Sequence, residues 1–491
     1  MTSFKEMHGE YIYYDNDGKI IKIEWYTHDV KDCELDITDG NHSYNHGNEQ
    51  LWQKYTLKEG KPDGQWILYH SNGQMSSYRE HKSGLKEGTW KAWHDDGNQW
   101  DEQIYVNGKK DGKSKRWRYD EVLEHEGQYK NDKKVGEWIY YYDNGKREYQ
   151  GKYKNGKKDG KWINFDESSG KKCGELNYKN GKLDGEYTEL NGDLIILDGQ
   201  YKDNKKTGKW IYTSDHGKVG KEENYSNGKL SGNYKEWHPD GKEWKIGNYK
   251  NGKLDGKYVE YHENGPNYLR GLYKSGKKEG EWVYHFDNGK VWKRGTYKND
   301  KKAGKWVYVH DNGAKSLEEN YVNGKLNGKY ISVFYSGVKD EVGTYKNGKK
   351  EGEWNSWHSN ETKRKKVVYK NGKLVSDKKW DDKGHLVYEI KYKNKKLNGK
   401  SIFWYRNGKL KRESIYKDDL QDGKYTEYRV NGTKISKGIM KNDKMQGKWM
   451  FWYHNGQKEC EIVCENGKLI DGKIWDDGGN IKESIRFNYK R

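Results

Sequence analysis

The stretch YQGKYKNGKKDGKW at residues 149–162 decides the fold, because close variants of it recur along most of the chain. Two runs rich in Tyr, Trp and Lys flank the pair Asn155-Gly156. An Asn-Gly pair between two such runs is the strongest short sequence signal for a two-residue β-hairpin turn, since both residues accept positive φ. The sequence therefore predicts a hairpin with Asn155-Gly156 at its tip.

A two-residue turn also fixes which residues face each other across the hairpin. Counting outward from the turn predicts four facing pairs: Lys154 with Lys157, Tyr153 with Lys158, Gly151 with Gly160, and Tyr149 with Trp162. The same rule pairs glycines elsewhere: Gly127 with Gly136, Gly199 with Gly208, Gly247 with Gly256, Gly271 with Gly280, Gly295 with Gly304, and Gly343 with Gly352. Since alternate residues of a strand share a face, Tyr153 and Trp162 are expected on one side, covering the glycines.

A glycine that most often begins the phrase Gly-Lys/Glu-Trp/Tyr recurs from Gly64 to Gly472 at steps of about 24 residues, with one double step near Ser376. The distance from the Trp to the next repeat's Tyr varies, and the slack lies near Asp143-Asn144-Gly145, as expected of an exposed turn. The expected fold is all-β: an elongated single-layer antiparallel β-meander, a solenoid-like array of about eighteen 24-residue β-hairpin repeats.

The repeat period divides the chain into three segments. Residues 1–56 are expected to form an N-terminal cap with degenerate repeats, residues 57–474 the hairpin array, and residues 475–491 a C-terminal cap. Atypical end units are what stops a solenoid from stacking further.

The composition excludes a large aliphatic core. Only 31% of the residues are hydrophobic and 35% are charged, yet 15% are aromatic, and rings in that number allow the chain to fold. The net charge of +19 comes mostly from Lys, whereas nucleic-acid readers favour Arg, so nucleic acid is not an expected partner. Four cysteines make no disulfide framework, and no run of 18 apolar residues occurs. We expect a soluble, intracellular, cytoplasmic protein without a signal peptide or transmembrane segment.

The first candidate site is the second aromatic residue of each repeat, three positions after the Trp. Its odd offset predicts the face opposite the Trp, where a ladder of rings could bind a partner. A bulge that turns these rings inward for packing is the alternative. The candidate binding face comprises Trp93, Tyr141, Trp237, Tyr261, Trp357 and Trp452.

The second candidate is a basic edge made by the lysines around the tight turns. Such an edge could attract an anionic membrane surface, or it could be a solvated margin that prevents aggregation. Its members include Lys130, Lys133, Lys154, Lys157, Lys298 and Lys301, and the neighbouring Lys134, Lys158 and Lys302 belong to the same clusters.

No sequence pattern points to catalysis, a cofactor or a metal. Cys460 and Cys464 with His454 make a poor zinc site, since a second ligand pair is missing, and Cys464 occupies a repeat Tyr position that favours packing. Phosphate-binding loops, nucleophile elbows and zinc-protease motifs are absent from the sequence. The chain is not expected to be an enzyme or to carry a cofactor.

The repeat unit resembles the MORN repeat, in the variant found in bacterial antitoxin-component (YwqK-type) proteins. The resemblance rests on Gly-Lys-Trp-Val-Tyr at 304–308 and on Tyr-Lys-Asn-Gly-Lys-Lys-Asp-Gly at 153–160, and it extends from Gly9 to about Gly472. It implies β-hairpin arrays that serve in scaffolding, dimerisation or membrane association. We therefore expect a scaffold that binds unidentified protein partners. A toxin-neutralising role, attachment to anionic lipid and a homodimer stay open.

Overall fold

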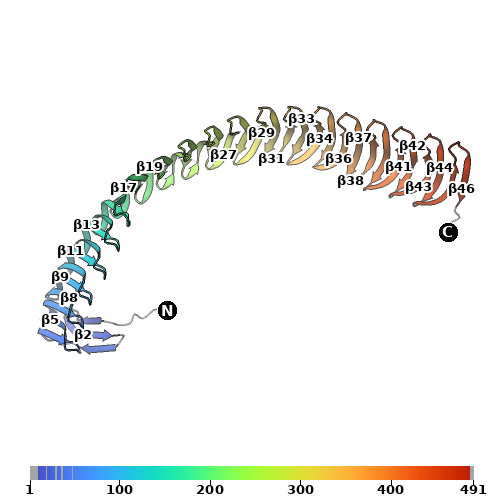
Figure 1. The fold of residues 1–491 in the computed structure, drawn as a ribbon. Helices are drawn as coiled ribbons and strands as arrows, with labels where there is room; N and C mark the ends of the chain where they lie inside the picture. The colour runs from blue at the N-terminus through green and yellow to red at the C-terminus, as the bar shows by residue number, and fades with distance from the viewer. Residues whose placement is uncertain (1–8, 18, 28–29, 35–36, 47, 487–491) are drawn as a thin grey trace. The chain divides into compact units, whose positions relative to one another are not determined.

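The computed structural model describes residues 9–17, 19–27, 30–34, 37–46 and 48–486. These residues form strands and turns, and none of them belongs to a helix. The strands make an antiparallel sheet that stays open, so the expected all-β hairpin array is confirmed (Figure 1).

The chain divides into two compact units, residues 1–241 and 242–491, each described by itself. The strands of the first unit are β1 Gly9–Tyr14, β2 Ile20–Thr27, β3 Val30–Glu34, β4 Gly40–Asn45, β5 Leu51–Lys58, β6 Lys61–Pro62, β7 Gly64–Tyr69, β8 Met75–Lys82, β9 Leu85–Trp93, β10 Gln99–Val106, β11 Lys109–Trp117, β12 Leu123–Lys130, β13 Lys133–Tyr141, β14 Arg147–Lys154, β15 Lys157–Phe165, β16 Lys172–Lys179, β17 Lys182–Asn191, β18 Leu194–Lys202, β19 Lys205–Thr213, β20 Val219–Ser226, β21 Lys229–Leu230 and β22 Gly232–Trp237. Those of the second unit are β23 Glu243–Lys250, β24 Lys253–Leu254, β25 Gly256–Tyr261, β26 Asn267–Lys274, β27 Lys277–His285, β28 Val291–Lys298, β29 Lys301–Val309, β30 Lys315–Val322, β31 Lys325–Leu326, β32 Gly328–Val333, β33 Lys339–Lys346, β34 Lys349–Trp357, β35 Lys363–Lys370, β36 Lys373–Trp380, β37 Leu386–Lys393, β38 Lys396–Leu397, β39 Gly399–Trp404, β40 Leu410–Lys417, β41 Leu420–Tyr428, β42 Lys434–Lys441, β43 Lys444–Trp452, β44 Lys458–Glu465, β45 Lys468–Trp475 and β46 Ile481–Arg486.

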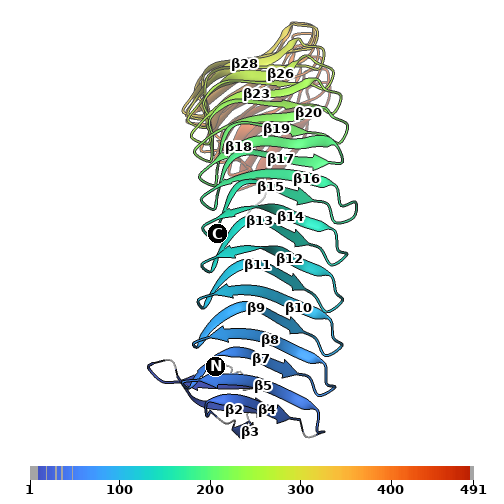
Figure 2. The ribbon, with the colours of Figure 1, turned by 90° about the vertical axis from the view of Figure 1, so that its left-hand side faces the viewer.

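Successive strands within each unit pair antiparallel with their sequence neighbours, as β14 does with β13 and β15. Figure 2 shows this stacking for the part of the first unit from β7 to β20, where successive strands lie side by side in chain order. The strands β1, β2 and β3 form a separate sheet. Contacts are therefore local in sequence, which is the property that defines repeat arrays.

The tight turn forms as predicted. Asn155 and Gly156 both have positive φ, 51° and 79°, as a type I′ turn requires. Lys154 faces Lys157, and Tyr153 faces Lys158. The register is confirmed for these first two pairs.

The predicted glycine pair is wrong. Gly151 faces Trp162 instead of Gly160, and Tyr149 faces Asn164. In the other six units the first glycine likewise lies against the aromatic residue two positions beyond the second glycine, as Gly295 lies against Trp306. The glycines of each predicted pair do not face each other.

A bulge beyond the turn explains the difference. Gly160 has φ of +78°, a left-handed conformation that interrupts a regular strand, so Lys152 lies opposite the three residues 159–161. Two extra residues shift the register by an even number, which leaves every later side chain on its predicted face. Tyr153 and Trp162 accordingly share a face, with ring centroids 5.1 Å apart at 90°.

In seven repeats an indole covers the bare backbone of the glycine that it faces. A Cβ built on Gly295 would lie 2.2 Å from Cδ2 of Trp306, so no side chain fits there. The indole Nε1 of Trp306 donates to the carbonyl of Thr296 at 3.1 Å. Seven tryptophans clamp a glycine in this way and are at most 2% exposed: Trp138, Trp162, Trp210, Trp282, Trp306, Trp354 and Trp449. The core of the array is this row of indoles.

Hydrogen bonds between neighbouring repeats join both edges of the sheet. At the tight turns, the amide of Gly156 donates to the carbonyl of Lys134 at 2.9 Å. At the variable turns, Asn312 Nδ2 donates to the carbonyl of Tyr335 at 3.0 Å, and Asn144 makes the same contact with Glu167 at 2.9 Å. Each repeat is therefore held by its neighbour as well as by its own hairpin.

The small N-terminal sheet packs on the first repeats of the array. The amide of Ile20 donates to the carbonyl of Gly60 at 2.9 Å. Ile20 and Ile23 are buried against Tyr55, Leu57 and other residues of the array, among them Trp66 and Leu68. The β1–β3 sheet thus covers the side of the first repeats on which Trp66 lies.

Candidate binding surfaces

The sheet has two chemically different sides. The Trp face carries the clamping tryptophans, such as Trp162, and the opposite Lys–Glu face carries ion pairs, such as Lys161 with Glu175 at 3.0 Å. Hydrogen bonds from Lys172 and Lys161 hold the pKa of Glu175 below its ordinary value. On the Lys–Glu face, charge is thus largely paired between neighbouring strands.

The second aromatic residue of the repeat lies on the Lys–Glu face. Glu126 faces Ile139, which is adjacent to Trp138 and therefore points to the opposite side. The hydroxyl of Tyr141 donates to Oε1 of Glu126 at 2.8 Å, which places Tyr141 with Ile139. A bulge does occur between Tyr140 and Tyr141, but it does not bring Tyr141 to the Trp face.

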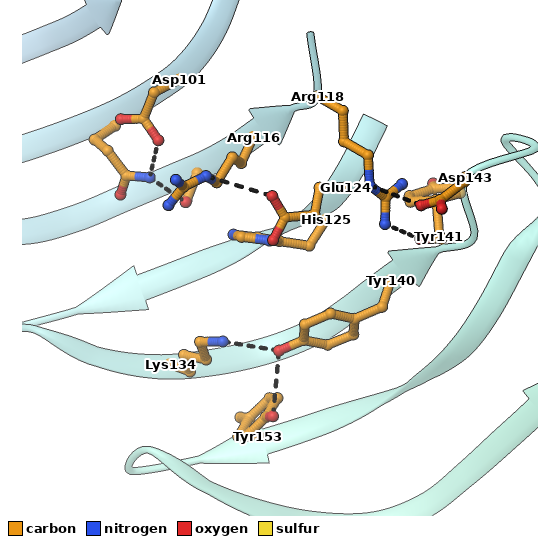
Figure 3. Close-up of polar contacts among 12 residues, drawn as sticks. Asp101, Arg116, Arg118, Glu124, His125, Lys134, Tyr140, Tyr141, Asp143 and Tyr153 are labelled. Carbon is orange, nitrogen blue, oxygen red and sulfur yellow. Dashed lines mark hydrogen bonds and ion pairs between the residues drawn. The ribbon is translucent and has the colours of Figure 1, made fainter. Parts of the chain in front are cut away.

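All six residues of the predicted binding face are half-buried, and none belongs to the core. Lys434 Nζ lies 5.5 Å from the ring of Trp452, so a cation already covers part of that indole. Figure 3 shows Tyr141 beside Asp143 and Arg118, close to the variable turn. These rings lie next to charged side chains and keep solvent-accessible surface.

A groove opens on the Lys–Glu face of the second unit. It has a volume of about 560 Å³ and is lined by residues including Lys400, Lys424, Lys448, Tyr428, Ile439 and Met450. Ammonium groups and the carboxylate of Glu413 surround an aliphatic and aromatic floor, and Lys400 pairs with Glu413 at 2.7 Å. Such a surface suits an acidic segment that also carries apolar side chains.

The six lysines of the predicted basic edge are all exposed. The stem of Lys133 lies 3.6 Å from a Cβ built on Gly156 in the next tight turn, and Lys157 and Lys301 make the same contact with Gly181 and Gly324. This packing aligns the ammonium groups along the edge. Lys130 pairs with Asp111 at 3.0 Å, so that charge is partly neutralised.

The second lysine of each pair does not belong to the edge, contrary to the prediction from the clusters. Lys134 Nζ lies 4.0 Å from the ring centroid of Trp138, on the Trp face, and donates to the hydroxyl of Tyr140 at 2.7 Å (Figure 3). Lys158 and Lys302 take the same position. Alternation along the strand separates neighbouring lysines, and partial burial lowers the pKa of these ammonium groups.

Tyrosines of the Trp face make the array sensitive to alkali. Burial, with a hydrogen bond to Glu223, raises the pKa of Tyr225 to about 12, from an ordinary value of about 10. The folded state therefore favours the protonated phenol, so its contribution to stability is present below pH 10 and is lost as the pH rises toward 12. We expect tyrosinate absorbance to rise together with loss of the β-sheet circular-dichroism signal. Ionisation of most tyrosines in the still-folded chain would contradict this.

The histidines before the variable turns have a structural role that the sequence did not indicate. A ring nitrogen of His70 lies 3.0 Å from the carbonyl of Trp93, and His310 lies 3.1 Å from that of Val333. Arg118 and Tyr142 make the equivalent bonds in their repeats. The recurrence of His, Tyr or Arg at the residue before the variable turn was the sequence signal from which this hydrogen bond to the next repeat could have been predicted.

The remaining candidates do not converge. Cys464 is buried where other repeats have Tyr, and it faces Gly447, while Cys460 faces Phe451. Among the described residues, no group of three His, Cys, Asp or Glu side chains is arranged to hold a metal ion. The described part of the chain also has no helix with the length and apolarity needed to cross a membrane. The side chain of Cys33 lies outside the described residues.

Five segments of the chain match the family model described as MORN repeat variant: residues 7–26, 134–155, 230–251, 278–299 and 397–418. The four segments from residue 134 onward each begin in the strand after one tight turn and end at the first residue of the next tight turn, so the matched length is that of the repeat unit. The match supports repeats of the MORN type in these five segments. The resemblance of the repeat unit to the MORN repeat variant is confirmed for these segments.

Comparison with curated proteins found no match. Among solved structures, the chain is similar to TcdB2-TccC3-Cdc42 (10% identity, 99% of this chain, 34% of that chain, TM-score 0.13). It is also similar to the Photorhabdus luminescens Tc holotoxin pore carrying TccC3-D651A (11% identity, 97% of this chain, 28% of that chain, TM-score 0.11). The chain spans about a third of the length of these structures or less.

Proposed function

We propose that this chain is a non-catalytic scaffold that binds a protein partner on its Lys–Glu face. The observation that carries the proposal is the position of Tyr141 opposite the Trp core, together with the half-burial of all six candidate aromatic residues. The Trp face builds the array, so rings on the other side are available for recognition. Aromatic residues are enriched at protein interfaces and often contribute most of the binding energy.

The residues that line the groove of the second unit indicate which chemical groups the partner would present. Lysines from three successive repeats line it together with Ile439 and Met450. We propose that the partner presents an acidic segment with apolar anchors. A toxin is one partner of this kind, and a second copy of the chain is another, so identification of the bound protein decides between antitoxin, scaffold and homodimer.

Replacing Tyr261, Trp357 and Trp452 together by Ser is expected to weaken partner binding by about tenfold or more. Folding is expected to stay intact, because none of these rings is in the core. Pull-down from the native source, followed by calorimetry with the recovered protein, measures the change. The matched control replaces three edge lysines, Lys154, Lys157 and Lys298, by Gln and is expected to keep the partner.

Two results would overturn the proposal. Unfolding of the triple variant would mean that the rings serve inter-repeat packing. Loss of partner binding in the lysine variant but not in the ring variant would move the site to the tight-turn edge. Co-sedimentation with anionic vesicles that depends on the same lysines would instead assign membrane attachment to that edge.

A further inference from the structure

The first tryptophan of the array differs from the seven that clamp a glycine. In those repeats the indole Nε1 donates to a carbonyl ten residues earlier, as Trp138 does to Gln128 at 3.1 Å. The corresponding carbonyl for Trp66 is that of Thr56, which accepts the amide of Asp63 at 3.0 Å. Trp66 is 2% exposed, and its Nε1 has no hydrogen-bond partner. A buried donor left unpaired is unfavourable and indicates that another acceptor belongs there.

A cavity of about 400 Å³ lies at this position, between β1 and the Trp face of the first repeats. Its volume is in the range of small-molecule sites. The apolar part of its wall comes from the N-terminal sheet and the array, and the polar part from β8 and β9. The lining residues are Ile12, Tyr14, Pro62, Trp66, Trp90 and Gly84, with the polar Arg79, His81 and Lys86.

The polar groups of the wall carry positive charge. Lys86 Nζ lies 4.3 Å and the Arg79 guanidinium carbon 5.7 Å from the ring centroid of Trp90. None of the described residues that line the cavity has a carboxylate. The described part of the lining therefore combines the ammonium group of Lys86 with aromatic walls, a combination that attracts anions with flat apolar bodies.

His81 supplies a second unpaired polar atom. Its Nδ1 is buried without a partner, and its ring lies 6.0 Å from that of Trp66 and 5.1 Å from that of Trp90. Burial, with Arg79 and Lys86 nearby, lowers the pKa of His81 to about 4, so the imidazole is neutral near pH 7. A neutral imidazole can donate one hydrogen bond to a ligand without adding charge.

We propose that this cavity binds a small aromatic carboxylate. The ring of the ligand packs against Trp66 and Trp90, and its carboxylate accepts hydrogen bonds from Lys86 and from the indole Nε1 of Trp66. Charge-assisted hydrogen bonds to a lysine in a partly dry site are strong, and they favour the anion over its neutral amide. The site lies on the Trp face, opposite the proposed partner surface. The two proposals are therefore independent, and refuting one leaves the other untouched.

Calorimetry on the full chain with indole-3-acetate, indole-3-acetamide and inorganic phosphate tests the site. We expect saturable binding of indole-3-acetate with a shift of the Trp66 indole N–H resonance, and binding of the amide that is weaker by about tenfold or more. Phosphate alone is expected not to compete, because it leaves the aromatic walls uncovered. Equal affinity for the amide, or full competition by phosphate, would overturn the aromatic-carboxylate assignment.

The variant Lys86→Met removes the charge but keeps the stem over Trp90. It is expected to weaken binding of indole-3-acetate by about tenfold. The matched control is Lys134→Met, since Lys134 occupies the same position over Trp138, in a repeat that does not line the cavity. Unchanged affinity in Lys86→Met, or an equal loss in both variants with folding retained, would refute the site.

Discussion

Replacing Gly295 by alanine is expected to destabilise its repeat by about 3 kcal/mol, as a severe case of overpacking. The added Cβ lies 2.2 Å from Cδ2 and 2.4 Å from Cε2 of Trp306, and that indole is fully buried between its neighbours. The φ of Gly295 is outside the left-handed region, so the cost comes from the indole and not from the backbone. Hydrogen exchange of the β28 and β29 amides, together with urea unfolding, measures the effect.

The matched control is Gly313→Asn at a variable turn. A Cβ there meets nothing within 4 Å, and asparagine tolerates the φ of +88° better than other side chains do. This variant is expected to cost less than about 1 kcal/mol. Similar losses for the two glycines would show that the Trp306 clamp is not what excludes a side chain from Gly295.

Replacing Trp306 by alanine is expected to cost about 3 to 5 kcal/mol, the range for removing a fully buried large ring. Trp306 contacts Tyr297 with ring centroids 5.0 Å apart, lies 4.5 Å below Lys302 Nζ, and donates its indole N–H to Thr296. All three contacts are lost at once. Because contacts in the array are local, hydrogen exchange should quicken in β28 to β30 and change little in distant repeats.

The double variant separates the two effects. With Trp306 gone, the methyl of Gly295→Ala has space, so the double variant is expected to be more stable than the sum of the single losses implies. Simple additivity would contradict direct contact between residues 295 and 306. Trp306→Phe, which keeps a ring but lacks the N–H group, shows how much of the loss comes from the hydrogen bond to Thr296.

The sequence was sufficient to predict where the hairpin turns lie and on which face of the sheet each side chain lies. Asn-Gly turns specify their own geometry, and side chains alternate between the two faces of a strand. It was not sufficient for the register beyond Lys158. Gly160 was interpreted as a small strand residue facing Gly151, whereas its left-handed φ marks a bulge. A glycine that recurs inside a strand pattern is itself a signal for a bulge, and that signal was available. The predicted faces are nevertheless correct, because the bulge shifts the register by two residues and an even shift leaves each side chain on the same face.

The candidate surfaces were predictable to different degrees. The position of Tyr141 opposite Trp138 follows from an odd offset, and the structure agrees. The division of Lys133 and Lys134 between edge and Trp face follows from the same alternation, but the clusters were taken as one stripe. The cavity beside Trp66 depends on a separate sheet folding onto the array and on an indole N–H of Trp66 that has no partner, and neither has a local sequence signature.

The contact between each clamping tryptophan and its glycine can be measured directly by NMR of the full chain with selectively labelled glycine. A proton beneath an indole ring is shifted upfield by the ring current. Seven glycines are expected to show such α-proton shifts and contacts to the facing indole: Gly127, Gly151, Gly199, Gly271, Gly295, Gly343 and Gly438. Contacts between the α-protons of Gly151 and Gly160, with no upfield shift, would instead establish the regular glycine pair and contradict the Trp clamp.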